Sequence, residues 1–579
     1  MNAAARARPS DRLSSPMVAV LGKRGRFLVA EPLFGHGPRT AVDARGSREG
    51  DLVLVGSGRR GARVVRQLGR PDVARDVLEG LMIDRGLRRA YARAATDEAE
   101  FAVAEPFAAD ARVDLTDLPT FTIDPPDARD FDDAISARRM KKGVLRVWVH
   151  IADVTAYVRP GGALEREAYR RATSVYVPGS VEPMLPEVLS NRACSLRPGE
   201  ERHAVTLEID LAGAEVRRTV FHRSRIRSDA RLTYDQVDKV FAGQERAAEP
   251  WGEPLAVARE AAAALADVRD SLQLGGAPEP VFEFDSGGHV TGVRHESETE
   301  SHRLIEQLMV LANEEVAAYL EDHKLPTLYR AHERPDPDSV EFLLEQLASL
   351  DLPTPPAPKQ MSPQQAADVV TEASKLVARE ADERQAPRIL VLRALKQAYY
   401  SPKNLGHAGL NSARYVHFTS PIRRWPDVIA HRSLLQGLGI DSAALPSHDL
   451  GEAGEVCSTV EREAMKIERD ADDVCLAFLL ERRLAEARAS EDPTFEGEVV
   501  GLIEKGAFVR FGDEGFEGML PVRRLRGWWT LNEVGTALEA EGSGRRLRLG
   551  DTVEVTVDRV ETARGRVDLS PAGAYSDNG

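Results

Sequence analysis

The stretch TFTIDPPDARDFDDAIS, residues 120–136, decides how the sequence is interpreted. It begins with the β-prone run FTI, and Pro125 and Pro126 then end any strand because proline cannot donate a hydrogen bond to a β-ladder. We therefore expect the next residues to form a loop at a strand end. Five aspartates fall within ten residues of this segment: Asp124, Asp127, Asp130, Asp132 and Asp133.

Carboxylates at this density repel one another, and a loop that holds them together shifts their pKa values unless cations neutralise the charge. Oxygen-only ligands favour a hard divalent cation such as Mg²⁺ or Ca²⁺, but the glycine and closing glutamate of an EF-hand are missing at the required offsets. The pattern favours Mg²⁺, with Mn²⁺ as a substitute, held by a few carboxylates and by phosphate oxygens of a substrate. A solvated acidic turn remains the alternative, because aspartate is common in turns.

A second motif, GHAGLNSARYVHFTSPIRRWPDVIAHRSL, spans residues 406–434. In it Arg423 and Arg424 follow a Ser-Pro turn and precede an apolar helical run. The planar guanidinium group of arginine binds phosphate, and a metal-dependent hydrolase needs cations opposite its metal. One of the two, Arg424, is equally well explained by a structural pair with Asp427.

Both motifs lie in a long mixed region, residues 111–490. It contains strand-like runs at 144–154 and 204–211 and Ala-rich amphipathic segments at 254–272 and 302–323. We expect an α+β protein in which this region is one large mixed α/β catalytic domain. Residues 71–110 show helical spacing and are expected to form a helical linker in front of it.

Residues 17–70 contain short β-prone runs separated by glycine-containing turns, which predicts a small cold-shock-like OB barrel after a disordered tail at 1–16. The first 70 residues hold 14 Lys and Arg against 5 Asp and Glu, so this part carries +9 in a chain of net charge −15. A basic solvated surface is one interpretation. The other is that arginines follow an RNA phosphate backbone, and the candidates are Arg24, Arg26, Arg59, Arg60 and Arg63.

Residues 491–573 have the pattern of a second five-stranded OB barrel, followed by a short tail at 574–579. Phe508 and Phe511 are three residues apart and should point to opposite faces of a strand, so at least one is a candidate for stacking on a base. A place in the barrel core is at least as good an explanation for either one. Trp528 and Trp529, in an insertion within this barrel, either stack on RNA or pack the insertion onto the barrel.

The composition excludes several other classes. No apolar run approaches the roughly 18–20 residues that cross a bilayer, and the N-terminus lacks the apolar stretch of a secretory signal. The three cysteines are too few and too scattered for a disulfide framework or a thiolate zinc site. We therefore expect a cytoplasmic protein with no membrane contact and no obligate protein partner, and we expect it to be a monomer.

Seven blocks of this chain, in their family order, closely resemble the catalytic domain of the RNase II/RNase R (RNB) family of exoribonucleases. The resemblance spans residues 111–485 and continues into a terminal barrel that resembles an S1-type RNA-binding domain. The blocks are the aspartate segment, VHIADVTAYV, TSVYVPGSVEPMLPEVLSNRACSLRPGEER, ARLTYDQV, SHRLIEQLMVLANEEVA, LYRAHERPD and HFTSPIRRWPDVIAHRSL.

The resemblance implies processive, Mg²⁺-dependent hydrolysis of single-stranded RNA from the 3′ end to nucleoside 5′-monophosphates, with a role in RNA decay. By motif, the metal-site residues would be Asp124, Asp130, Asp132 and Asp133, with Asp132 the most critical. Asp127 has no counterpart and is interpreted as a turn residue. The remaining implied roles belong to Tyr176, which stacks near the RNA 3′ end, Tyr234 in the catalytic cavity, Arg423 at the scissile phosphate, and a glutamate, Glu468 in preference to Glu461.

The chain also departs from the family pattern. It has room for one barrel before the catalytic domain where two are common, and it lacks a lysine-rich tail, so degradation of duplex RNA is in doubt. Two other functions stay open: a non-catalytic RNA-binding protein that retains the fold, and a different metal-dependent phosphodiesterase or endonuclease. The four matching aspartates favour the exoribonuclease over both.

Overall fold

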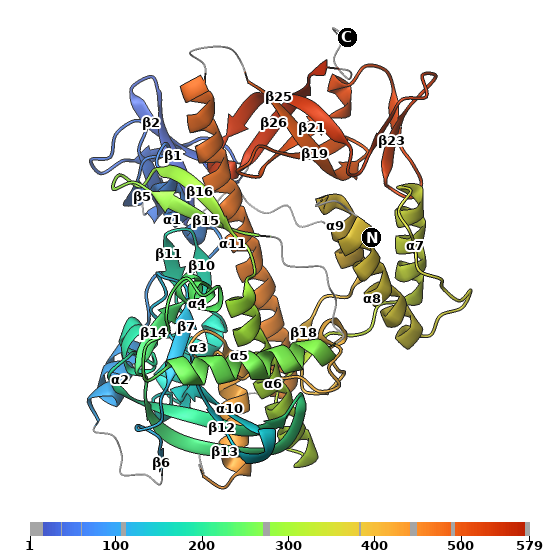
Figure 1. The fold of residues 1–579 in the computed structure, drawn as a ribbon. Coiled ribbons are helices and arrows are strands. Elements are labelled where there is room, and N and C mark those ends of the chain that lie inside the picture. The colour runs from blue at the N-terminus through green and yellow to red at the C-terminus, as the bar shows by residue number, and fades with distance from the viewer. Residues whose placement is uncertain are drawn as a thin grey trace, which may run out of the picture.

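The structure is a computed structural model that describes residues 16–35, 37–58, 61–105, 112–269, 278–380, 384–440, 449–487 and 493–573. The predicted tails, apart from residue 16, and the candidate phosphate-binding residues Arg59 and Arg60 lie outside these ranges. Figure 1 shows a body built around a sheet, with one small barrel at each side of a long helix above it.

The first barrel is closed by five strands in the order β1-β2-β3-β5-β4. The β1 side chains of Ala19 and Leu21 join Val53 and Val55 of β4 in the barrel core, whereas the buried Val18 packs in the core that contains residues of α1 (Ala74–Asp84). The β-prone runs of the sequence correspond to β1 (Met17–Arg24), β2 (Phe27–Pro32), β3 (Thr40–Asp43), β4 (Leu52–Gly58) and β5 (Gly61–Gly69).

Two helices follow the barrel, as the helical spacing after residue 70 predicts. They are α1 (Ala74–Asp84), which packs against the barrel, and α2 (Arg93–Ala104), which packs against α3 (Ala163–Arg171).

A seven-stranded sheet in the order β14-β7-β8-β9-β12-β13-β6 forms the centre of the body. Its β7–β8 pair is antiparallel, and β14 runs parallel to β7. The strands are β6 (Val113–Asp114), β7 (Phe121–Asp124), β8 (Asp133–Arg139), β9 (Leu145–Ala152), β12 (Glu201–Ala212), β13 (Glu215–Arg227) and β14 (Ala230–Thr233).

Helices cover both faces of this sheet. The Ala-rich segments form α5 (Gly252–Val268) and α6 (Glu300–Asp322), whose apolar residues share one core with β8, β9 and β12. On the other face, small strand residues such as Ala134 and Ala152 join α3 and α10 (Trp425–Gly437) in a second core. The remaining helix next to β14 is α4 (Tyr234–Phe241).

The 38-residue helix α11 (Leu450–Ala487) connects the body to both barrels. It rises from the body and passes between the barrels (Figure 1), with contacts to α1, to β10 (Val175–Val177) and to the second barrel. Three short pairings accompany the body: β10 with β11 (Ser180–Glu182), β15 (Glu279–Phe284) with β16 (Val290–Glu296), and β17 (Tyr329–Ala331) with β18 (Tyr399–Ser401).

The second barrel contacts α9 (Gln385–Ala394) through its first strand, and α9 packs with α7 (Pro337–Ser349) and α8 (Pro363–Glu380). Glu498 of this barrel accepts hydrogen bonds from the Gln385 and Ala386 N–H groups, which satisfies donors at the start of α9. The barrel order is β19-β20-β21-β26-β25, and its strands are β19 (Thr494–Ile503), β20 (Gly506–Phe511), β21 (Phe516–Pro521), β25 (Thr552–Glu561) and β26 (Arg566–Pro571).

The insertion between β21 and β25 folds as a separate three-stranded sheet of β22 (Trp529–Leu531), β23 (Ala537–Ala540) and β24 (Arg546–Arg548). With two small closed barrels flanking a mixed helix-and-sheet body, the structure confirms the predicted α+β class. In the part of the chain that is described, no helix has the length and apolar character needed to cross a membrane.

Candidate active site

The aspartate loop connects two neighbouring strands of the central sheet. Asp124 is the last residue of β7 and Asp133 is the first residue of β8, so the sheet holds both ends of the loop in fixed positions. Ser195 holds the middle, because its hydroxyl donates to the Arg129 carbonyl at 2.8 Å and accepts from the Phe131 N–H at 3.0 Å. The loop therefore lies at a strand end, as the two prolines predict.

Asp132 is the most deeply buried aspartate of this loop, with 5% of its surface exposed. One carboxylate oxygen, Oδ1, accepts a hydrogen bond from the Ile422 N–H at 2.8 Å. The other, Oδ2, lies 3.6 Å from Nε of Arg423 and has no hydrogen-bond partner. The two sequence motifs, about 290 residues apart, thus meet at Asp132.

Burial destabilises the ionised form of the carboxylates in this loop. It raises the pKa of Asp124 to about 7, with a further contribution from the charge of Asp133. It also raises the pKa of Asp133 to about 6 and that of Asp132 well above its usual range, although the Arg423 guanidinium opposes both shifts. A bound cation would relieve this cost by stabilising the ionised carboxylates.

The residues of the loop fit a hard divalent cation. Asp124 and Asp132 each bury one carboxylate oxygen with no hydrogen-bond partner, and these atoms are free to act as ligands. Within the described ranges no three His, Cys, Asp or Glu side chains form a ready-made metal centre. The two unpartnered carboxylate oxygens of Asp124 and Asp132 suit Mg²⁺, which is usually held by one or two carboxylates with water and substrate phosphate completing its shell.

Tyr176 lies across the loop, on strand β10. Its hydroxyl donates to Oδ2 of Asp130 at 2.9 Å, and its backbone N–H donates to Oε1 of Glu468 on α11 at 2.8 Å. The residue remains 38% exposed, so part of its ring is accessible for stacking. Glu461, earlier on the same helix, accepts from Arg330, whereas Glu468 contacts the strand that carries Tyr176.

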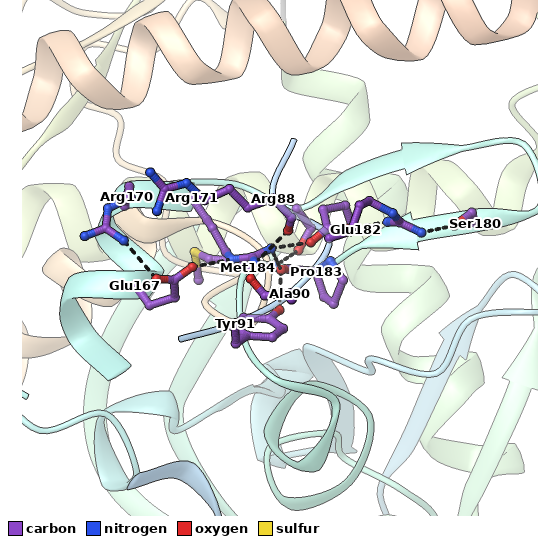
Figure 2. Close-up of polar contacts among 12 residues, drawn as sticks. Arg88, Ala90, Tyr91, Glu167, Arg170, Arg171, Ser180, Glu182, Pro183 and Met184 are labelled. Atoms are coloured by element: carbon purple, nitrogen blue, oxygen red, sulfur yellow. Dashed lines mark hydrogen bonds and ion pairs between the residues drawn. The ribbon is translucent and has the colours of Figure 1, made fainter. Parts of the chain in front are cut away.

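A buried arginine cluster supports the β10–β11 hairpin that carries Tyr176 (Figure 2). The Arg171 side chain donates to Glu182 of this hairpin and, at 2.8 Å, to the carbonyl of Arg88 in the linker. Its guanidinium group also lies 3.9 Å from the centre of the Tyr91 ring. These contacts fix the linker after α1 against the hairpin and so hold Tyr176 in place.

The two adjacent arginines have different environments. Arg424 forms two hydrogen bonds with the buried Asp427, of 2.9 and 2.8 Å, so its role is structural. The Arg423 side chain is 44% exposed and faces Asp132, while its backbone carbonyl accepts from the Ser174 N–H at 2.9 Å. Ser174, two residues before Tyr176, therefore helps to position Arg423, whose exposed guanidinium group is accessible to a substrate.

Tyr234 begins α4 beside the loop and stacks on His302 of α6, with ring centroids 3.8 Å apart. His302 is held in turn by a hydrogen bond of 2.7 Å between its Nδ1 and the Thr299 hydroxyl. Tyr234 follows Thr233, which pairs with Asp124 in the β14–β7 ladder, so Tyr234 begins its helix at the same sheet end as the aspartate loop. Burial raises the pKa of Tyr234, and the charges of Asp133 and Asp124 add to the rise.

Sequence reasoning missed three groups at this site: the Ile422 N–H, Ser195 and His302. A backbone N–H leaves no mark in sequence, and Ser195 stands in a segment whose proximity depends on the complete fold. The spacing of Thr299 and His302, which form a capping box, is the one local feature that could have drawn attention to this histidine.

The barrels contribute exposed residues away from this loop. Arg24 and Arg26 are exposed at the β1–β2 turn, where the Arg26 guanidinium lies 5.1 Å from the centre of the Phe27 ring. Phe27 is 59% exposed, and it was not among the predicted contacts. An arginine pair beside an exposed aromatic ring is suited to single-stranded nucleic acid.

The second barrel corrects one prediction. Phe511 is buried in the core, where it packs on Phe495 and Phe516, so it has no free face for a base. Phe508 points the other way, is partly exposed and lines a pocket, so it stays a candidate for stacking. The insertion separates its tryptophans similarly, with Trp528 71% exposed and Trp529 buried.

Family models match two parts of the chain. The RNB domain model matches residues 112–439, and the S1 RNA binding domain model matches residues 489–571. Ribonuclease R of Escherichia coli is 35% identical over 479 residues, which cover 79% of this chain and 57% of that protein. Ribonuclease R of Aquifex aeolicus is 36% identical over 471 residues, covering 79% of this chain and 64% of that protein. The chain thus spans about three fifths of the length of these relatives.

Solved structures show the same fold. Mycoplasma genitalium RNase R in complex with ribose methylated single-stranded RNA superimposes with a TM-score of 0.83 at 23% identity, covering 96% of this chain and 89% of that one. Yeast Ssd1, a pseudonuclease, gives a TM-score of 0.65 at 17% identity, with 92% and 68% covered. At such identities the likeness concerns the fold alone. With more than half of its length matched by the RNB domain model, the chain belongs to the RNB domain family.

Proposed function

We propose that this protein is a processive 3′-to-5′ exoribonuclease that hydrolyses single-stranded RNA to nucleoside 5′-monophosphates with Mg²⁺. Membership of the RNB domain family and the likeness to Ribonuclease R proteins support the reaction class. Because a pseudonuclease shares the fold, the family alone is not sufficient. The observation that carries the proposal is Asp132, whose buried carboxylate meets Arg423 and the Ile422 N–H from the second motif.

Each residue has a specific task in this proposal. Asp124, Asp130, Asp132 and Asp133 would hold the metal, which supplies an activated water and neutralises charge on the phosphate. Arg423 binds a non-bridging oxygen of the scissile phosphate through its exposed guanidinium group. Glu468 accepts the Tyr176 N–H and thereby fixes the backbone of β10.

Tyr176 and Tyr234 hold the RNA 3′ end next to the aspartates. The accessible part of the Tyr176 ring stacks on the terminal base, and its hydroxyl, bonded to Asp130, ties that base to the metal-binding loop. Tyr234 is fixed by stacking on His302 and forms another wall of the same cavity. Processivity follows because the barrels retain the strand while its end advances by one nucleotide after each cut.

The test is the digestion of 5′-labelled single-stranded RNA with and without Mg²⁺. We expect a ladder that shortens from the 3′ end, no cleavage in the presence of a chelator, and no cleavage of DNA of the same sequence. Internal cuts from the first time point would indicate an endonuclease. RNA binding without cleavage in Mg²⁺ or Mn²⁺ would indicate a non-catalytic RNA-binding protein.

A further inference from the structure

An arginine-lined pocket lies beside the aspartate loop, and its lining includes Ala128, Arg129 and Phe131 of that loop. It has a volume of about 560 Å³, within the range of about 300–1,000 Å³ that is usual for small-molecule sites. Loop residues Arg129 and Phe131 form one wall, and the opposite wall comes from the segment before β12 and from β14. The charged residues of its lining are Arg129, Arg192, Arg197, Arg231 and Glu187.

The positive charge of this pocket is incompletely neutralised, although the chain as a whole carries −15. The side chains of Arg129 and Arg192 make no hydrogen bond or ion pair with any described residue. Arg197 has only a partly exposed pair with Glu200 at 3.7 Å, which contributes little. Four arginines against one glutamate leave a surplus of positive charge in a concave site, which attracts an anion.

Arg231 links this pocket to the aspartate loop. Its Nη2 donates to the carbonyl of Pro125 in the aspartate loop, and its guanidinium carbon lies 5.4 Å from the centre of the Phe131 ring. Its Nε is buried and has no hydrogen-bond partner. These contacts with Pro125 and Phe131 hold the Arg231 guanidinium group against the aspartate loop, where it lines the pocket.

The chemistry of the lining selects a phosphate with a small polar body attached. Arginine forks bind phosphate oxygens in pairs and also stack on the planes of bases, while Asn191 adds an amide that can donate or accept. The lining residues Arg129 and Phe131 are the sequence neighbours of the proposed metal-site residues Asp130 and Asp132. The pocket is thus adjacent to the place where a nucleoside monophosphate would be released.

We propose that this pocket binds the phosphate of a nucleoside 5′-monophosphate, the class of product released by the proposed function, on which the assignment of the ligand rests. Arg129, Arg192 and Arg231 bind the phosphate, and Asn191 contacts the nucleoside. Arg423, which contacts Asp132, is not among the residues that line the pocket.

The experiment is calorimetric titration of the full chain with adenosine 5′-monophosphate in the presence of a chelator. We expect saturable binding that inorganic phosphate competes for and adenosine does not. The double variant Arg129→Ala/Arg192→Ala should raise the Kd by at least about 10-fold, since two charge-assisted hydrogen bonds are removed. The single variant Arg192→Glu should reduce affinity further than Arg192→Ala.

Two control variants locate the binding. Arg217→Ala removes a surface arginine, paired with Glu215 on β13, and should leave the Kd within about 2-fold of the original value. Arg423→Ala should do the same, because Arg423 does not line the pocket. Thermal unfolding of each variant, compared with the unaltered chain, separates a loss of binding from a loss of folding.

Three results would overturn the site: no saturable binding, unchanged affinity in a folded Arg129→Ala/Arg192→Ala variant, or loss of binding in Arg423→Ala alone. Competition by an oligoribonucleotide without terminal phosphates would also overturn it, in favour of an RNA strand. RNA hydrolysis measured on the same preparations keeps the two proposals apart. RNA cleavage without nucleotide binding would contradict only the proposed nucleotide site. Nucleotide binding without RNA cleavage would contradict the proposed function.

Discussion

The aspartate loop and the exposed tip of the first barrel use charge in opposite ways. At the loop, Asp132 is buried and is fixed by a hydrogen bond from a distant part of the chain. At the β1–β2 turn, Arg24, Arg26 and Phe27 are exposed, and the β1–β2 hairpin carries them. Buried and fixed groups are suited to stabilising a transition state, whereas exposed groups are suited to capturing a long anion.

The largest expected effect is at the loop. Asp132→Asn keeps the shape of the side chain but removes a charge, so we expect turnover of single-stranded RNA to fall by at least about 10³-fold. RNA affinity should change little, because the barrels are intact. The control is Asp127→Asn, which alters an exposed aspartate of the same loop and should leave turnover near normal. Normal turnover in Asp132→Asn would contradict the proposed catalytic role of the buried aspartate.

The next largest effects are expected at the adjacent residues Arg423 and Arg424, which should differ in what their loss impairs. Arg424→Ala leaves the buried Asp427 without its partner, and we expect the free energy of unfolding to fall by about 3–5 kcal/mol. Arg423→Ala removes a half-exposed group and should leave stability nearly unchanged while kcat falls about 100-fold. Urea titration and steady-state kinetics on both variants measure the two outcomes. The opposite pattern would mean that their roles have been exchanged.

In the second barrel, Phe511 should contribute to stability and Phe508 to RNA binding. Phe511→Ala removes a fully buried ring and should cost about 3–5 kcal/mol of stability. Phe508→Ala alters a partly exposed ring and should weaken RNA binding by about 1–3 kcal/mol if it stacks on a base. Filter binding and urea titration of the two variants provide the measurement. Equal effects on stability would place both rings in the core.

The burial of the aspartates also predicts a pH dependence of stability in the metal-free protein. The pKa of Asp124 is about 7 in the folded state and about 3.9 in an unfolded chain, so the folded state binds the proton more tightly. This contribution to stability is present below about pH 4 and is lost as the pH rises through about 7.

Urea unfolding at pH 5 and pH 8 with a chelator tests this expectation. The free energy of unfolding should decrease between these pH values, and the decrease should be smaller in Asp124→Asn. Added Mg²⁺ should stabilise the unaltered protein more at pH 8 than at pH 5, because ligand carboxylates must be ionised. An identical decrease in both proteins would contradict the assigned pKa.

The smallest effect is expected at the β1–β2 turn. Replacing Arg24 and Arg26 with alanine should lower RNA affinity a few-fold at low salt and leave kcat unchanged. The slope of log Kd against log salt should become shallower by about 0.7 for each phosphate that is no longer neutralised by an arginine. Arg39→Ala, which removes an exposed arginine paired with Glu31, is the matched control. A reduced kcat in the double variant would link this barrel directly to the chemistry.

The sequence allowed much of this architecture to be predicted because its patterns are local. Strand runs with glycine turns indicated both barrels, and the Ala-rich segments form α5 and α6. The length of α11 and its place between the barrels were not predicted, since they depend on packing between distant segments.

Some residues of the candidate site could likewise be predicted from the sequence, whereas others needed the structure. Residue types and motifs were enough to select the aspartates, Tyr176, Tyr234 and Arg423 as candidates. They did not distinguish Phe508 from Phe511, because strand alternation says that the two differ but not which one points inward. The choice of Glu468 over Glu461 likewise needed a three-dimensional contact, the hydrogen bond from the Tyr176 N–H.

The most direct test of the proposed function is the chemistry of the first product. Single-stranded RNA is digested with Mg²⁺ in ¹⁸O-labelled water, and the products of early time points are identified by mass spectrometry. Hydrolysis from the 3′ end predicts nucleoside 5′-monophosphates that carry one ¹⁸O atom on the phosphate, with their yield abolished in Asp132→Asn. Unlabelled mononucleotides, or internal fragments as the first products, would contradict the proposed reaction.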